Sequence, residues 1–267
     1  MSLWSRLRDA RYALPALVER HVAGPSARDV AALGARQGGH ASFGYFPANP
    51  STPDTIEAAN LEMLAAGAGL DAYLSIKAPH MAFAPDRHDR IAAAAKAAGM
   101  AILFDAHAPH QAEATLALAE RLAAGAVLPA RWQRSRGDAE RMRDQAGRIR
   151  VVKGEWADPD GDAANKDAAY LALIGHLAGR AAPVAVATHD PLLAAAAMDM
   201  LLKAGTPCEL EMLRGLPARR CAAEAAARAV PVRFYWPFGP GWWPYAVDKA
   251  LARPYLPLWF LRDRLGL

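Results

Sequence analysis

VPVRFYWPFGPGWWPYAVDKALAR, residues 230–253, opens as a short apolar and aromatic run, breaks at the proline and glycine cluster of 237–241, and resumes with helical spacing at Trp242. This pattern predicts a strand, a sharp turn and a helix. Residues just past the carboxyl end of a parallel strand line the ligand crevice of α/β proteins. We therefore expect four side chains of this stretch near a pocket: Tyr235, Tyr245, Asp248 and Lys249.

The rest of the chain alternates between short β-type runs and alanine-rich amphipathic segments. The other β-type runs lie at 40–46, 72–77, 100–105, 126–130, 149–153, 183–188 and 207–213. Eight strand signals, each followed by a helix signal, predict a (βα)8 barrel. An open doubly wound sheet is the competing architecture. It is less favoured because eight units fit closure and no G-x-G-x-x-G follows the first run.

Residues 1–38 look helical and are expected to form a lead-in, with the barrel occupying 39–267. Ser26 with Asp29 three residues later is a capping-box variant that predicts a helix start. Thr52 and Pro53 predict a second start, as N-cap and first helical position.

Composition narrows the class of protein. A chain of 267 residues with 53% hydrophobic residues can bury a large core. Cys208 and Cys221 are too few for a disulfide framework, have no metal-ligand spacing, and are interpreted as packing residues. The basic residues behind the net charge of +4 are dispersed, which argues against a nucleic-acid partner. No apolar run reaches the ~18 residues of a membrane span and no signal-peptide core is visible, so we expect a cytoplasmic protein.

Polar and ionisable residues recur at or just past the carboxyl ends of the predicted strands. They are Lys77 and His80, Asp105 and His107, Arg150 and Lys153, Thr188 with His189 and Asp190, Glu211, and Tyr235. Barrel enzymes build their active sites on that face, so the repetition predicts a shared site.

The run RIRVVKGEW at 148–156 brings two cations to a glycine turn. Arg150 and Lys153 are an odd number of positions apart, so both reach one ligand only if Lys153 lies in the turn. A cation and free backbone N–H groups suit a phosphate or an anionic reduced ring. The alternative is that Arg150 pairs with an acid of another strand inside the barrel.

The sequence ATHD at 187–190 runs directly into a helix pattern, so Thr188, His189 and Asp190 occupy the N-cap region, which favours anions. The alternative is that Asp190 is only a cap and His189 faces solvent. The next strand reads CELEMLRG at 208–215, and acids inside a barrel must be paired.

Together and in this order, several motifs resemble the proline dehydrogenase family of flavoenzymes. They are the R-x-V-K-G turn, the A-T-H-D corner, the E-x-x-M-L-x-G run and the closing V-R-x-Y-x-P-x-G-x-x-W-x-P-Y, with L-S-I-K ending at Lys77 and the acid Asp105. The resemblance covers about residues 43–253, and the ordered set is more specific than any one motif.

The resemblance implies a distorted (βα)8 barrel that holds FAD at its carboxyl face, oxidises L-proline or a related imino compound by hydride transfer to flavin N5, and passes electrons to a quinone. It implies a hydrogen bond from Arg150 near N5 and cofactor contacts from Val152, Lys153, Gly154, Trp156, Thr188, His189 and Asp190. It places Lys77, Asp105, Leu213, Tyr235 and Tyr245 around the substrate. With Arg150, the pair Lys77 and Asp105 is the expected catalytic group.

The sequence also departs from the family. Where the family has an Arg-Arg pair that grips the proline carboxylate, followed by a Glu, this chain has Asp248, Lys249 and Ala252. Lysine lacks the fork of arginine, and an aspartate repels a carboxylate. Three explanations stay open: Arg253 rebuilds the cationic site, the substrate is an amine without a carboxylate, or the barrel binds a ligand without catalysis. The family's flavin-facing Gln is Pro129 here, and Glu155 stands in a shortened K-G-A-Y-W motif.

Other interpretations of single features remain. His80, His107 and His110 with Asp105 would suit a metal, although their spacing matches no standard motif. Lys77 or Lys153 would suit a Schiff base. The apolar and aromatic run 255–267 fits either a helix covering the core or a peripheral contact with a membrane surface.

Overall fold

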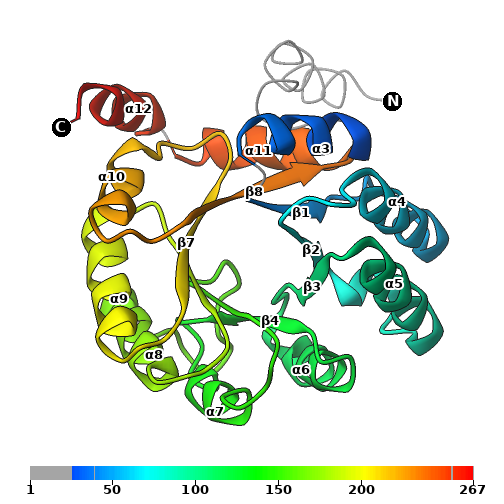
Figure 1. The fold of residues 1–267 in the computed structure, drawn as a ribbon, viewed down its shortest axis with the longest axis horizontal. Coiled ribbons are helices and arrows are strands. Elements are labelled where there is room, and N and C mark those ends of the chain that lie inside the picture. Colours follow the sequence, from blue (N-terminus) through cyan, green and yellow to red (C-terminus); the bar gives the residue numbers. More distant parts are fainter. Residues whose placement is uncertain (1–25, 39, 254, 267) are drawn as a thin grey trace.

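The computed structural model describes residues 26–38, 40–253 and 255–266, and its centre is a closed barrel of eight parallel strands (Figure 1). Each strand pairs with the next along the chain, and the last pairs with the first. The barrel expectation is confirmed, and the open sheet is wrong. The strands are β1 (Ala41–Tyr45), β2 (Ala72–Ile76), β3 (Ala101–Phe104), β4 (Gly125–Pro129), β5 (Ile149–Val152), β6 (Val184–Ala187), β7 (Cys208–Leu213) and β8 (Val232–Phe238).

Helices surround the barrel and bury its outer face (Figure 1). They are α3 (Ala27–Arg36), α4 (Pro53–Ala66), α5 (Pro85–Ala98), α6 (Ala112–Arg121), α7 (Ser135–Arg141), α8 (Lys166–Leu177), α9 (Pro191–Lys203), α10 (Arg219–Ala227), α11 (Trp242–Leu251) and α12 (Leu256–Leu265). The 3₁₀ turns η1 (Ala78–Met81) and η2 (Pro109–Gln111) follow β2 and β3. The core is rich in small residues, which lets the helices approach the strands closely.

The predicted helix starts are confirmed at both caps. The Ser26 hydroxyl accepts a hydrogen bond from the backbone N–H of Asp29 at 3.2 Å, and the Thr52 hydroxyl accepts one from Thr55 at 3.2 Å. These bonds satisfy N–H groups that have no partner within the helix. Of the predicted lead-in, α3 is described, and residues 1–25 lie outside the described part of the chain.

Strand β8 corrects the sequence interpretation at one point. The predicted break at Pro237 is wrong, because the strand continues to Phe238, with Pro237 in register with Gly44 of β1. The turn begins at Gly239, whose φ of +96° suits glycine and where a Cβ would lie 2.5 Å from the Tyr45 ring. The pairing of β8 with β1 thus stabilises the strand through Pro237 although proline has no N–H to donate. The helix that follows starts at Trp242, as expected.

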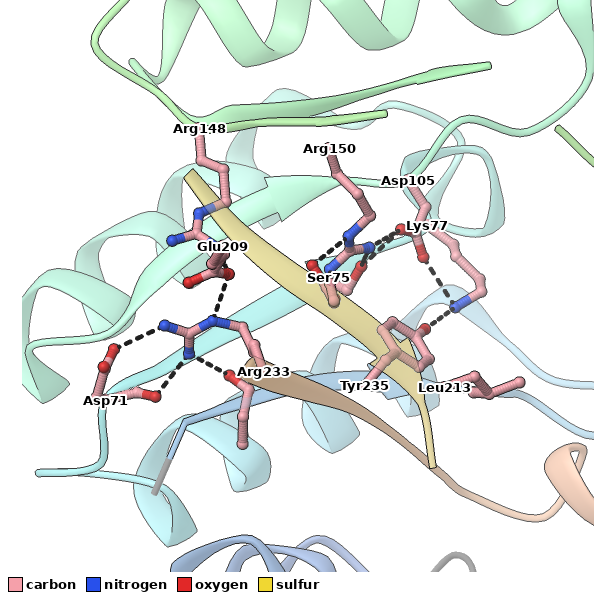
Figure 2. Close-up of polar contacts among 12 residues, drawn as sticks. Asp71, Ser75, Lys77, Asp105, Arg148, Arg150, Glu209, Leu213, Arg233 and Tyr235 are labelled. Atoms are coloured by element: carbon pink, nitrogen blue, oxygen red, sulfur yellow. Dashed lines mark hydrogen bonds and ion pairs between the residues drawn. The ribbon is translucent and has the colours of Figure 1, made fainter. Parts of the chain in front are cut away.

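The barrel interior carries two layers of charge, both shown in Figure 2. Residues two apart on a strand point to the same side, so Arg148 and Arg150 lie one above the other, as do Glu209 and Glu211. In the lower layer Glu209 pairs with Arg148 and, at 2.7 Å, with Arg233. Arg233 also reaches Asp71 at 3.0 Å. These pairs satisfy charges that would be costly to bury alone.

The last helix is held mainly by a polar contact. The Asp263 carboxylate accepts hydrogen bonds from the first backbone N–H groups around α10, those of Ala218, Arg219 and Arg220. Leu256 is buried, but most apolar side chains of α12 are exposed, among them Leu258 and Leu261. The expectation of a core-covering helix is therefore wrong for most of this segment. Within the described residues, no helix combines the length and apolar character needed to cross a membrane.

We expect the lower charged layer to contribute to the free energy of unfolding. Glu209→Gln removes the carboxylate that pairs with buried Arg148 and leaves Arg233 with Asp71 alone, and we expect the free energy of unfolding to fall by roughly 3 kcal/mol. Urea denaturation measures this change. The matched control is Glu224→Gln, which removes the partner of Arg228 at the surface and should cost about 1 kcal/mol or less. Equal effects from the two variants would contradict a buried network at this position.

His88 makes a prediction about pH. Its ring is buried against Phe104 of β3, and its Nδ1 donates to the Ala84 carbonyl at 2.7 Å. Burial lowers the pKa of His88 below 6.5. The unfolded chain therefore gains a proton at a higher pH than the folded one, and stability is lost as pH falls below about 6.5. His88→Gln should flatten this pH dependence in urea unfolding, whereas His110→Gln, at an exposed site, should not.

Candidate active site

The upper charged layer forms the floor of the site. Arg150 projects from β5 and pairs with Glu211 of β7 at 2.6 Å and with Asp105, just past β3, at 3.0 Å. Its Nη1 also donates to the Ser75 hydroxyl of β2 at 3.0 Å. Lys77, one residue past β2, reaches the other oxygen of Asp105 at 3.2 Å (Figure 2). Only the barrel interior connects β2, β3, β5 and β7, so these contacts fix Arg150 on the barrel axis.

Burial and pairing set the protonation states of this layer. Burial alone would raise the pKa of Asp105, but Lys77 and Arg150 outweigh it and lower that pKa below 3.8. Burial likewise opposes the charge on Arg150, yet Glu211 and Asp105 raise its pKa. Burial lowers the pKa of Lys77 and raises that of Tyr235. Arg150 and Asp105 therefore stay charged at neutral pH, and the Tyr235 hydroxyl keeps its proton.

A cavity of about 570 Å³ opens above this floor at the carboxyl ends of the strands. One wall is aromatic: the rings of Phe46, Trp242 and Tyr245 lie 5.0 to 5.6 Å apart. We refer to this space as the first cavity. The predicted site residues on its lining are Lys77, Asp105, Arg150, Val152, Gly154, Trp156, Thr188, His189, Leu213, Tyr235 and Tyr245. The structure thus brings these residues of separate motifs around one cavity.

A second cavity of about 720 Å³ adjoins the first, and the two share Ala187, Thr188 and His189. Two aromatic residues on its wall, Tyr255 and Trp259, come from the chain around α12. Its basic lining residues are Lys153, Arg220, Arg253 and Arg262, and among the described lining residues only Asp190 is acidic. The second cavity therefore has a cationic lining.

The A-T-H-D corner forms the wall between the two cavities. Asp190 caps α9 by accepting from the N–H groups of Leu192 and Leu193, as predicted. His189 is held at both ring nitrogens: Nδ1 lies 2.7 Å from the Pro217 carbonyl, and Nε2 accepts from the Leu213 N–H at 3.0 Å. A solvent-facing His189 is therefore wrong. Burial lowers the pKa of His189, which favours this neutral tautomer.

The glycine turn after β5 serves both cavities. Lys153 lies beyond the strand end, lines the second cavity, and pairs with Asp167 at 2.5 Å. Arg150 therefore lines the first cavity and Lys153 lines the second. Gly154 has φ +98°, and a Cβ there would lie 2.9 Å from Pro129, so the turn needs glycine.

The side chain that follows the turn bridges to α11. Glu155 accepts a hydrogen bond from the Tyr245 hydroxyl at 3.0 Å and pairs with Lys249 at 2.5 Å. Lys249 and Asp248 are outside the lining of both cavities, and Asp248 is exposed. Of the residues predicted to contact substrate, these two are the ones that the fold does not bring to a cavity.

Other residues of the site were not among the predicted contacts. The Lys77 ammonium lies 4.1 Å from the centre of the Phe46 ring. The Ser75 hydroxyl accepts a hydrogen bond from Arg150 and donates one to Asp105. Ser75 could have been found because it lies two residues before Lys77, on the inward side of β2. Phe46 and Trp242 lie in loops and helix starts, where no periodicity indicates direction.

The histidines form an edge of the first cavity. The rings of His80 and His107 lie edge to face at 5.0 Å, and His107 lies 5.3 Å from Trp156. Burial, with His107 and Lys77 nearby, lowers the pKa of His80 to about 4, so this pair is neutral at pH 7. Within the described residues, no group of three histidine, cysteine or acidic side chains is placed to hold a metal ion.

No protein-family model matches the chain. Among curated proteins, it is 29% identical over 139 residues to proline dehydrogenase 1 of Bacillus subtilis, covering 49% of this chain and 45% of that protein. It is 28% identical over 210 residues to proline dehydrogenase of Deinococcus radiodurans, covering 70% of this chain and 67% of that protein. The chain thus spans about half the length of the first relative and two thirds of the second.

Solved structures agree at the level of the fold. Proline utilization A of Bdellovibrio bacteriovorus, inactivated by N-propargylglycine, superposes with a TM-score of 0.73 at 17% identity, covering 87% of this chain and 32% of that one. Proline utilization A of Corynebacterium freiburgense superposes with a TM-score of 0.68 at 18% identity, covering 97% of this chain and 32% of that one. The curated relatives confirm the resemblance read from the sequence motifs: the chain is similar to proteins named proline dehydrogenase.

Proposed function

We propose that the chain is an FAD-dependent dehydrogenase that oxidises the carbon next to the nitrogen of a secondary amine, such as L-proline or a related imino compound. Its relatives named proline dehydrogenase support this reaction class. The observation that carries the proposal is the pair of adjoining cavities. One is cationic and suits a nucleotide diphosphate, and the other has an aromatic wall over a buried Arg150 and suits a flavin ring with its substrate.

The chemical groups on the lining of the two cavities are of the types that bind a flavin nucleotide. The lining of the second cavity combines Arg220, Arg253 and Arg262 with the aromatic ring of Trp259, and such groups bind phosphates and stack on a base. Thr188, His189 and Asp190 would contact the adenine half at the junction. Val152, Lys153, Gly154 and Trp156 would hold the middle of the cofactor, and Arg150 would lie beneath the redox ring.

When bound, the flavin supplies the hydride acceptor at N5. The substrate C–H bond would break with its electron pair leaving on the hydrogen, the nitrogen lone pair would form the C=N bond, and the N–H proton would pass to solvent to leave an imine. Arg150 stabilises the negative charge that the acceptor gains, at a position fixed by Glu211 and Asp105. Tyr235, Tyr245 and Leu213 would orient the ring and exclude water.

The two protons and two electrons taken from the amine must leave through an electron acceptor, and we propose a quinone. The exposed apolar side chains of α12, with Arg262 and Arg264 beside them, would suit a peripheral contact with a lipid surface where quinones reside.

The reaction is tested with purified protein loaded with FAD under anaerobic conditions. We expect a flavin absorbance spectrum that bleaches on addition of a cyclic secondary amine and recovers on addition of a soluble quinone. Protein that does not take up FAD would contradict the proposal. Protein that holds FAD but is not bleached by any cyclic amine would leave only a ligand-binding barrel.

Arg150 gives a second prediction. Arg150→Met removes the charge beneath the redox ring, and we expect flavin reduction to slow at least about tenfold, which corresponds to ~1.4 kcal/mol of transition-state stabilisation. Rapid-mixing absorbance measures the rate. Arg150→Lys should keep part of it, and Arg228→Met at the surface is the matched control. Wild-type reduction rates in a folded Arg150→Met variant would refute the assigned role.

A further inference from the structure

The cations on the floor of the first cavity are already bound to carboxylates of the protein. Arg150 pairs with Glu211 at 2.6 Å and with Asp105 at 3.0 Å. Lys77 pairs with the second oxygen of Asp105 at 3.2 Å. All four side chains are largely buried, so these pairs are not screened by solvent. A ligand carboxylate would have to displace one of these acids to reach a cation of the floor.

The rim of the cavity repeats this arrangement. Lys249 lies 2.5 Å from one oxygen of Glu155, and the Tyr245 hydroxyl donates to the other at 3.0 Å. Glu155 and Tyr245 both line the cavity. The Glu155 carboxylate therefore receives the two donors of α11 that a ligand carboxylate at this rim would use.

The described cations at the floor and rim of the first cavity are all paired with carboxylates of the protein. The lining carboxylates Asp105, Glu155 and Glu211 are matched by Lys77, by Arg150 and, at the rim, by Lys249, and burial keeps His80 and His107 neutral at pH 7. A carboxylate brought into such a site loses its hydration without gaining an opposite charge. An ammonium group finds, in the aromatic wall, ring faces that attract cations.

We propose that Glu155 determines substrate specificity by occupying the carboxylate position at the rim, and that the substrate is a cyclic secondary amine without a carboxylate, of the pyrrolidine or piperidine type. The inference rests on the proposed function and narrows its substrate class. The reaction balances as follows: the ammonium would first release one proton to solvent, which frees the nitrogen lone pair. One ring C–H bond would then break, its electron pair would pass with the hydrogen to the flavin, the lone pair would form the C=N bond, and the remaining N–H proton would pass to solvent to leave an imine.

The first measurement is the selectivity of the wild-type protein. Anaerobic isothermal titration calorimetry is done with pyrrolidine and with L-proline on FAD-loaded protein reduced beforehand with dithionite. It gives the ratio of the two dissociation constants without any redox step, because a reduced flavin cannot accept a hydride. We expect pyrrolidine to bind at least tenfold more tightly. Binding of L-proline as tight as that of pyrrolidine, or no measurable binding of either compound, overturns the inference.

The second measurement assigns the selectivity to the rim. Glu155→Ala frees the Lys249 ammonium and the Tyr245 hydroxyl, and the affinity for L-proline should rise at least tenfold while that for pyrrolidine falls or stays constant. Adding Lys249→Ala should abolish the gain. Glu155→Gln keeps the size of the side chain and should give a smaller change in the same direction. Glu224→Ala, which removes a surface partner of Arg228, is the matched control and should leave the ratio unchanged.

An unchanged ratio in folded Glu155→Ala protein, checked by circular dichroism, contradicts the role of Glu155. The test of the substrate class and the test of the proposed reaction can give different results. If L-proline bleaches the flavin faster than pyrrolidine does, the dehydrogenase stands and the substrate inference fails. If calorimetry shows the expected selectivity but neither compound bleaches the flavin, the inference about the cavity stands and the reaction fails.

Discussion

The pairing of Arg150 with Glu211 and Asp105 is the constraint on which the site depends. A guanidinium on the axis of a barrel must be matched by carboxylates, because an unpaired buried charge costs several kcal/mol. The matching acids come from β7 and from the end of β3, and Ser75 adds a contact from β2. Four segments far apart in sequence are thereby tied to one point, and this point becomes the floor of the first cavity.

The same requirement explains the layer below. Barrel interiors are commonly filled by branched apolar residues, but here Arg148, Glu209 and Arg233 fill the amino-terminal half with charge. The Tyr73 ring lies against the guanidinium groups of Arg148 and Arg233 in the lower layer, and the Tyr235 ring lies 5.3 Å from that of Arg150 in the upper layer. The charged interior gives a rigid base for the site, since each side chain is held by partners on other strands.

Most of the fold and much of the site could be predicted from the sequence. Eight β-type runs gave the barrel because strand periodicity is local, and the observed strands begin within two residues of the predicted positions. The ordered motifs placed Arg150, Thr188 and Tyr235 at one rim because parallel strands share a carboxyl edge. The continuation of β8 through Pro237 was missed because local turn chemistry was outweighed by pairing with β1.

Contacts between distant loops could not be predicted. Glu155 meets Tyr245 across 90 positions of sequence, and no periodicity relates a loop after β5 to a helix after β8. Without that contact Lys249 and Asp248 were expected at the substrate, whereas neither residue lines a cavity and Lys249 pairs with Glu155 at the rim. Glu155, the acid that lines the cavity in their place, was noted in the sequence, but its contact with Tyr245 could not be predicted.

The central claim is that two adjoining cavities, joined at Thr188 and His189, receive one flavin nucleotide with its redox ring over Arg150. A crystal structure of the protein grown with FAD tests this most directly. The account predicts density for the isoalloxazine in the first cavity and for the adenine half beside Trp259 in the second. Density for FAD at any other place, or both cavities filled only by solvent at saturating FAD, would contradict it.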